Sequence, residues 1–221
     1  SGRFGVTGAA SDPKASFNLD ANSVQANALT QAGLSAINAS AVGRFENQTV
    51  TLTNASARDG RGLTANASGS IPLNGSGLRL DVQAEAPLAL ANRFLRVRGS
   101  RLSGGGSVKA SVTGSLSDPV VNGLVSVNSG TFVDPLSNLR LENLNLLASL
   151  QGDRVSINRA NANLAGGGQF SASGRIGLRE GFPADLAISL AEARYTDGEI
   201  FTVRLGAQLS VHMESCYQLS M

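Results

Sequence analysis

Side chains that could carry out catalysis or bind a metal are scarce in this chain. His212 is the one histidine and Cys216 the one cysteine among 221 residues. A histidine-assisted nucleophile needs a histidine beside it in the fold, and a multi-histidine metal site needs several. Because His212 stands alone in a C-terminal segment unlike the rest, the sequence predicts neither kind of site. A single cysteine also excludes an intramolecular disulfide.

Paired carboxylates are the remaining route to acid–base catalysis. The chain has 16 Asp and Glu residues, and most of them lie at turn signals or alternate with apolar residues. That placement is typical of carboxylates on a solvated face. The sequence therefore predicts a protein that is not an enzyme and that has no catalytic residues, no cofactor and no metal site.

Two glycine runs, Gly104-Gly105-Gly106 and Gly166-Gly167-Gly168, could suggest a phosphate-binding loop. Such a loop needs Gly-Lys-Ser/Thr at the start of a helix, or a strand–turn–helix unit, and the sequence offers neither context. We expect these glycines to precede strands and to allow bends or bulges. The Asp-Pro pairs that begin at Asp12, Asp118 and Asp134 are expected to mark strand entries, because proline cannot donate to a strand ladder.

The charge pattern argues against a nucleic-acid partner. The 18 Lys and Arg residues outnumber the 16 Asp and Glu residues by two, which gives a net charge of +2. The basic residues are spread along the chain apart from a cluster at Arg93, Arg96, Arg98 and Arg101. A scattered set does not form a stripe that follows a phosphate backbone. With eight Phe, two Tyr and no Trp, a platform for stacking bases is also hard to assemble.

The dominant pattern along the chain is an alternation of apolar and polar residues with a period of two. It is clearest in Leu78–Ala86, Val108–Val112, Leu186–Leu190 and Val203–Val211. Turn signals such as Asn74-Gly75 separate the alternating segments. We therefore expect an all-β, mostly antiparallel sheet with an apolar and a polar face. The nearest helix candidate, Ala21–Asn38, has no clear apolar stripe and is expected to be a strand.

Three motifs occur twice, in the same order and about 105 residues apart. The pairs are Val6–Pro13 with Val112–Pro119, Val50–Ala57 with Val155–Ala162, and Ala67–Ile71 with Ala172–Ile176. Repetition on this scale is typical of an elongated array rather than a globule with one pocket. We expect one repeat unit at 1–105 and a second at 106–211. Residues 212–221 break the alternation and are expected to form a divergent, disordered tail.

No stretch approaches the roughly 18 consecutive apolar residues of a membrane-spanning helix, and no signal peptide opens the chain. The chain begins at Ser1 in the middle of a pattern. We therefore expect it to be a fragment of a longer protein, whose anchor or targeting segment lies elsewhere.

The second repeat resembles the TamB family, the inner-membrane component of the translocation and assembly module. The residues that carry the resemblance are Thr113–Pro119, Gly123–Pro135, Leu139–Leu146, Gly152–Val155, Gly166–Gly168, Ser173–Ile176, Phe182–Leu186 and Ala193–Gly198. Residues 112–211 show the pattern strongly, and residues 6–97 repeat it more weakly.

The resemblance implies a long periplasmic protein of Gram-negative bacteria that is anchored in the inner membrane. It implies a curved, trough- or taco-like sheet with an apolar interior. It also implies phospholipid movement between the membranes, support of outer-membrane protein assembly, and an outer-membrane barrel of the Omp85 superfamily (TamA-like) as partner. The anchor is not in this chain.

The apolar residues of the strands are modest in size. A sheet built from them must cover its apolar face by folding over on itself, by pairing with a partner, or by binding a hydrophobic ligand. We expect phospholipid acyl chains to occupy that face. The residues expected to line it are Leu80, Val82, Val108, Ala110, Val112, Leu139, Leu141, Val155, Ile157, Leu186, Ile188, Leu190, Val203, Leu205 and Leu209. The alternative is a β-solenoid adhesin or passenger domain, with a sealed core and no cargo.

Overall fold

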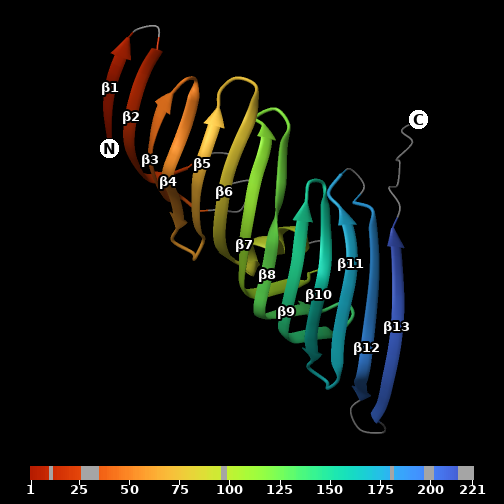
Figure 1. The fold of residues 1–221 in the computed structure, drawn as a ribbon. Helices are drawn as coiled ribbons and strands as arrows, with labels where there is room; N and C mark the ends of the chain where they lie inside the picture. Colours follow the sequence, from red (N-terminus) through yellow and green to blue (C-terminus); the bar gives the residue numbers. More distant parts are fainter. Residues whose placement is uncertain (10–11, 26–34, 96–98, 180–181, 197–201, 214–221) are drawn as a thin grey trace, which may run out of the picture. The chain divides into compact units, whose positions relative to one another are not determined.

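Thirteen strands, neighbours in the sheet in the same order as in the chain, make up most of the described part of the protein (Figure 1). The computed structural model describes residues 1–9, 12–25, 35–95, 99–179, 182–196 and 202–213. Each pair of neighbouring strands with a defined register is antiparallel. The all-β, antiparallel sheet expected from the alternation is therefore confirmed.

The chain divides into two compact units. Unit 1 comprises Ser1–Leu90 with Ser107–Gly123, and unit 2 comprises Ala91–Gly106 with Leu124–Met221. The boundary expected between residues 105 and 106 falls inside the strand β7 (Arg101–Ser115), so it does not coincide with the end of an element.

The strands of the first half are β1 (Gly2–Ala9), β2 (Asp12–Val24), β3 (Ile37–Glu46), β4 (Thr49–Asp59), β5 (Thr64–Pro72) and β6 (Ser76–Pro87). After β7 follow β8 (Pro119–Asp134), β9 (Leu139–Gln151), β10 (Arg154–Leu164), β11 (Gln169–Gly177), β12 (Ala184–Thr196) and β13 (Thr202–Met213). Each strand lies in the sheet beside the strands that precede and follow it in the chain.

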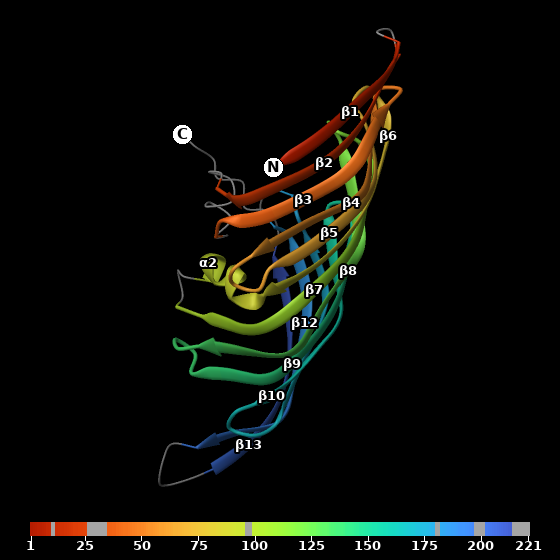
Figure 2. The same cartoon turned by 90° about the vertical axis from the view of Figure 1, so that its left-hand side faces the viewer.

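A short helical segment lies between β6 and β7. The 3-10 helix η1 (Leu88–Ala91) is followed by the single turn α2 (Asn92–Leu95). The side-chain amide of Asn92 donates to the backbone oxygen of Leu102 at 3.0 Å and accepts from the backbone N–H of Leu102 at 2.6 Å. These two bonds hold α2 beside the start of β7 (Figure 2).

The register sorts the side chains onto two faces, because directly opposed residues on antiparallel strands point the same way. We call a set of directly opposed residues a row. In unit 2, one row contains Leu146, Ala160, Ala172, Ile188 and Leu209, the next contains Ala148, Ile157, Gly174, Leu186 and Val211, and a third contains Leu150, Val155, Ile176, Ala184 and Met213. These rows define the apolar face of unit 2, and the residues between them form its polar face.

Unit 1 has an apolar face built in the same way. Its rows are Ala21, Ala39, Ala57, Ala65 and Ala84; then Leu19, Ala41, Ala55, Ala67 and Val82; then Phe17, Gly43, Leu52, Gly69 and Leu80; and then Ala15, Phe45, Val50 and Ile71. Leu78, which is almost fully buried, continues the apolar alternation of β6. The first of these rows contains only alanine.

Both units interrupt the alternation with a β-bulge at the same point of the repeat. In β4 the register shifts between Leu52 and Ala55, and in β10 it shifts between Ile157 and Ala160. Each bulge keeps the apolar residues on one face while it bends the strand. The strands are accordingly curved along their length (Figure 2).

A glycine stands opposite the last residue before each bulge. Leu52 pairs with Gly69 and Ile157 pairs with Gly174, and the two glycines have φ angles of 138° and 145°. A Cβ atom on either glycine would lie 2.1 Å from a backbone oxygen of the next strand. Glycine is required here both for the backbone conformation and for the close approach of the neighbouring strand.

Three local expectations need correction. The single strand expected over Ala21–Asn38 is wrong, because Ala21 and Ala39 are directly opposed on β2 and β3, so this segment contains the reversal between two strands. Its residues 26–34 lie outside the described part. Gly104–Gly106 lie inside β7 rather than before it, and Asp134 ends β8 rather than opening a strand.

Candidate functional site

The apolar face of unit 2 is the most extensive candidate site in the described residues. Each strand from β9 to β13 contributes apolar side chains to it, and the polar side chains of the same strands lie on the other face. Four alanines of this face, Ala148, Ala160, Ala162 and Ala184, are buried. The face is therefore a continuous layer of aliphatic side chains.

The larger side chains of this face are only partly covered. In β13, 51% of Leu205 and 52% of Leu209 is exposed, and no large side chain in the described part is completely buried. An exposed apolar layer of this kind is uncommon on a protein that functions alone in water, and it is typical of an interaction surface.

Most of the residues expected from the sequence to line a groove lie on an apolar face. Leu141, Val155, Ile157, Leu186, Ile188, Leu190, Leu205 and Leu209 lie on that of unit 2, and Leu80 and Val82 on that of unit 1. Leu139 is half-buried at the start of β9. Val108, Ala110 and Val112 are half-buried on β7, and the side chain of Val203 lies outside the described part. The lining of a groove by these residues stays a prediction.

The same faces include aromatic residues that the predicted lining left out, although they follow the alternation of their strands. Phe17 and Phe45 belong to the rows of unit 1, and Phe170 stands between Ala162 and Leu190 in unit 2. The bulges have a sequence signal of their own: apolar residues in the repeated motif are spaced by two, then by three, then by two again. This change of phase keeps them on one face.

Charged side chains lie on the polar face or at its ends. Ion pairs join Arg140 Nε to Glu142 Oε1 at 2.8 Å and Arg204 Nη1 to Glu192 Oε2 at 3.4 Å. These carboxylates are exposed, so each pair contributes little to stability.

The strand pair β2 and β3 carries one further pair, between Lys14 and Glu46. The hydrogen bond from Lys14 and its charge lower the pKa of the Glu46 carboxyl. A carboxylate with a lowered pKa stays ionised at neutral pH, so it is unsuited to act as a general acid.

Side chains that could ligate a metal are dispersed in the described residues. In this part of the chain, no three His, Cys, Asp or Glu side chains gather where they could hold a metal ion. Among the described residues, no helix is long and apolar enough to span a bilayer. What the arrangement does provide is apolar contact area.

Comparison of the chain with family models, with curated proteins and with solved structures finds no match. The resemblance to the TamB family therefore stays a prediction that depends on the motifs named above.

Proposed function

We propose that the apolar face of this chain shelters the acyl chains of phospholipids. The observation that carries the proposal is the continuity of that face over β9–β13, where the larger aliphatic side chains keep partial exposure and polar residues alternate onto the opposite side. Each methylene group moved from water to such a surface gains about 0.8 kcal/mol. Contact of this kind needs no specific pocket, so a chain could slide along the rows.

The TamB resemblance extends the proposal to the whole protein. In this proposal the chain is a segment of a periplasm-spanning protein that is anchored in the inner membrane. It shields acyl chains during phospholipid transport to the outer membrane and supports outer-membrane protein assembly with an Omp85-type, TamA-like barrel.

The alternative of a sealed β-solenoid has less support. Stacked solenoid rungs enclose a core of completely buried side chains, whereas in the described residues the large apolar side chains keep partial exposure. The neighbouring strands with a defined register are also antiparallel hairpin partners.

Photo-crosslinking from the two faces of β13 tests the proposal. A crosslinking amino acid at Leu209 should capture phospholipid, and the same amino acid at the adjacent Gln208 should not, because the two side chains are exposed on opposite faces of one strand. Leu205 and Arg204 form a second matched pair. Equal capture from both faces would contradict the proposal.

A further inference from the structure

The polar face of unit 2 contains a row without charge. Asn145, Asn161, Ser171, Ser189 and Gln208 are directly opposed on the five strands β9–β13. We call these five residues the polar row. Neighbouring strands are about 4.8 Å apart, so the row presents amide and hydroxyl groups at a regular interval across the sheet.

The face is hollowed along this row. A hollow of about 360 Å³ is lined by Asn145, Asn161, Ser171 and Ser189, among others. A second hollow of about 340 Å³ shares the last three of these residues and adds Gln208. A third, of about 550 Å³, continues past Ser189 and Gln208 to Gly206. Each hollow shares residues of the polar row with the next, so the three hollows follow the row from β9 to β13.

Most of the polar row is free to bind. Within the described part of the chain, the side chains of Asn161, Ser171, Ser189 and Gln208 make no hydrogen bond to the protein. Asn145 is engaged, since its amide donates to the backbone oxygen of Asn143 at 2.8 Å and accepts from the N–H of Ser129 at 3.3 Å. The free groups include both donors and acceptors.

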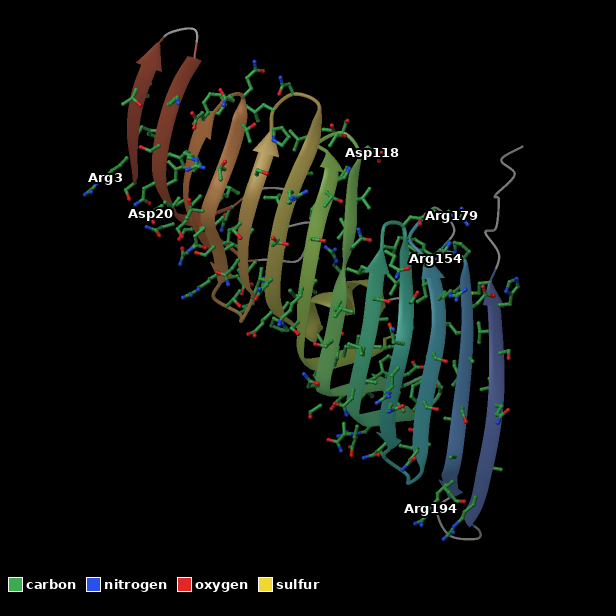
Figure 3. The ribbon with its side chains drawn as sticks, in the orientation of Figure 1. Arg3, Asp20, Asp118, Arg154, Arg179 and Arg194 are labelled. Atoms are coloured by element: carbon green, nitrogen blue, oxygen red, sulfur yellow. The ribbon has the colours of Figure 1, made fainter. Side chains whose placement is uncertain are left out.

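The charges near the polar row belong to neighbouring rows: Glu192 and Arg204, which pair with each other at 3.4 Å, line the third hollow at its end. The row that contains Arg175, Asp185 and His212 lies nearer one end of the strands, and the opposed pair Arg194 and Arg204 lies nearer the other. In Figure 3 the labelled Arg154 and Arg194 likewise lie at strand ends. Arg159, at the bulge of β10, is the one charged side chain that lines the second hollow. A phosphate polymer would find little to pair with in the centre.

From these observations we propose that the polar row binds a neutral, unbranched, β1,4-linked oligosaccharide. Each sugar of such a chain offers hydroxyl groups that both donate and accept, and the polar row presents a partner for them on each of five neighbouring strands. An extended glycan can therefore bond to the polar row at successive rings. This site lies on the face opposite the proposed acyl-chain surface and is independent of it.

Unit 1 supplies an internal control. The same position of its repeat carries Ser40, Ser56, Asn66 and Gln83, which are directly opposed on β3–β6. There the hydroxyls of Ser40 and Ser56 bond to each other at 2.8 Å, and Asp20 brings a charge into the row. We expect weaker glycan binding by this row.

Titration of the isotope-labelled chain with N-acetylchitotetraose, followed by NMR, tests the inference. Amide shifts should concentrate at Asn161, Ser171, Ser189 and Gln208. The variant Asn161→Leu/Ser171→Val should weaken binding about tenfold, because hydrogen bonds at two successive rings are lost. The matched variant Ser40→Val/Ser56→Val in unit 1 should leave the affinity unchanged.

One further variant and one further ligand test the same inference. Gln208→Leu changes an exposed position on the last described strand, so it should weaken binding without affecting folding, which the circular dichroism spectrum checks. N-acetylglucosamine alone should bind far more weakly than the tetramer, because one sugar reaches only part of the polar row. Equal binding of monomer and tetramer, unaltered affinity of the variants, or no binding at all would overturn the inference.

Discussion

The two repeats have the same β-bulge and the same register around it, but they differ in the size of the apolar side chains. The bulge before Ala55 in β4 and the bulge before Ala160 in β10 have the same register with both neighbouring strands. Yet the row of Ala57, Ala65 and Ala84 in unit 1 corresponds to Ala162, Phe170 and Leu190 in unit 2.

Different residues therefore determine the geometry of the strands and the volume of the side chains on them. The bulges and their opposed glycines fix the curvature and the facing of each strand, whatever the size of the apolar residues. Side-chain size then sets how much apolar area each row offers. In unit 1 this row presents only methyl groups, whereas unit 2 carries Phe170 and Leu190 at the same level.

The largest effect is expected where the two repeats are the same. Gly69→Val and Gly174→Val should each lower the free energy of unfolding by about 3 kcal/mol or more, because a left-handed φ is combined with a clash against the next strand. Urea denaturation would measure both. As a control, Gly75→Ala, with a φ of 79° but no atom within 4 Å of its Cβ, should cost much less. A mild effect of either valine would show that the shared plan does not depend on these glycines.

Exchanging side-chain size between the repeats should give an intermediate effect. Phe170→Ala should destabilise the protein by about 1 to 2 kcal/mol and reduce lipid capture, since a half-buried ring is lost. Ala65→Phe, at the corresponding position of the alanine row, should leave stability within about 1 kcal/mol and raise lipid capture, because Ala65 is only half-buried and the ring adds apolar area to the face. Thermal unfolding and co-purified lipid would report on the pair. Strong destabilisation by Ala65→Phe would mean that something already covers this face.

Charge on the apolar face should separate binding from folding. Ile188→Arg should give a folded variant, destabilised by about 1 to 2 kcal/mol, that captures little phospholipid, because the guanidinium can extend from an open face to water. Ala187→Arg, the adjacent position on the polar face, is the matched control and should leave capture intact. Loss of the β signal in circular dichroism by Ile188→Arg alone would favour a sealed core.

The smallest effect concerns the turns that close the two bulged hairpins. Asp59 closes the β4–β5 turn: its Oδ1 accepts from the N–H of Leu63 at 2.8 Å and from that of Arg61 at 2.9 Å. Partial burial works to raise the pKa of Asp59, but these backbone hydrogen bonds outweigh it and the pKa is lowered. In the corresponding β10–β11 turn, Leu164 takes the place of Asp59, and its N–H donates to the oxygen of Gly168 at 3.0 Å.

Because its pKa is lowered in the folded state, Asp59 contributes stability above the ordinary aspartate pKa of about 3.9 and loses it as the pH falls through the folded value. Acidification should therefore reduce hydrogen-exchange protection at Leu63 by about 1 kcal/mol or less, while Leu164 keeps its protection. In Asp59→Asn the difference between the two turns should no longer depend on pH. Parallel loss at both turns would assign the effect to global unfolding instead.

The sequence predicted the strands well because alternation is a local pattern that an open, two-faced sheet preserves. Val203–Val211 and Leu186–Leu190 follow it without interruption. The bulges were harder, because Thr53 and Asn54 look like ordinary polar residues until their neighbours Leu52 and Ala55 are required to share a face. The reversal within Ala21–Asn38 was missed, since no Asn-Gly or Asp-Gly pair marks it.

The polar row could not be predicted from the sequence. Ser171 and Ser189 are far apart in the chain and resemble many other serines. The alignment of the whole polar row depends on the register of four strand pairs. That register depends on the turn lengths and the bulges. Only the assembled sheet brings these residues together.

The order of the strands has a consequence for how the chain is made. Because each strand pairs with the strands that adjoin it in the chain, no strand has to wait for a distant segment of the sequence before it can pair. Pairing can therefore begin as soon as two strands have emerged from the ribosome or a translocation pore, and it can proceed one hairpin at a time. A premature stop or a local defect would then leave the strands already paired intact.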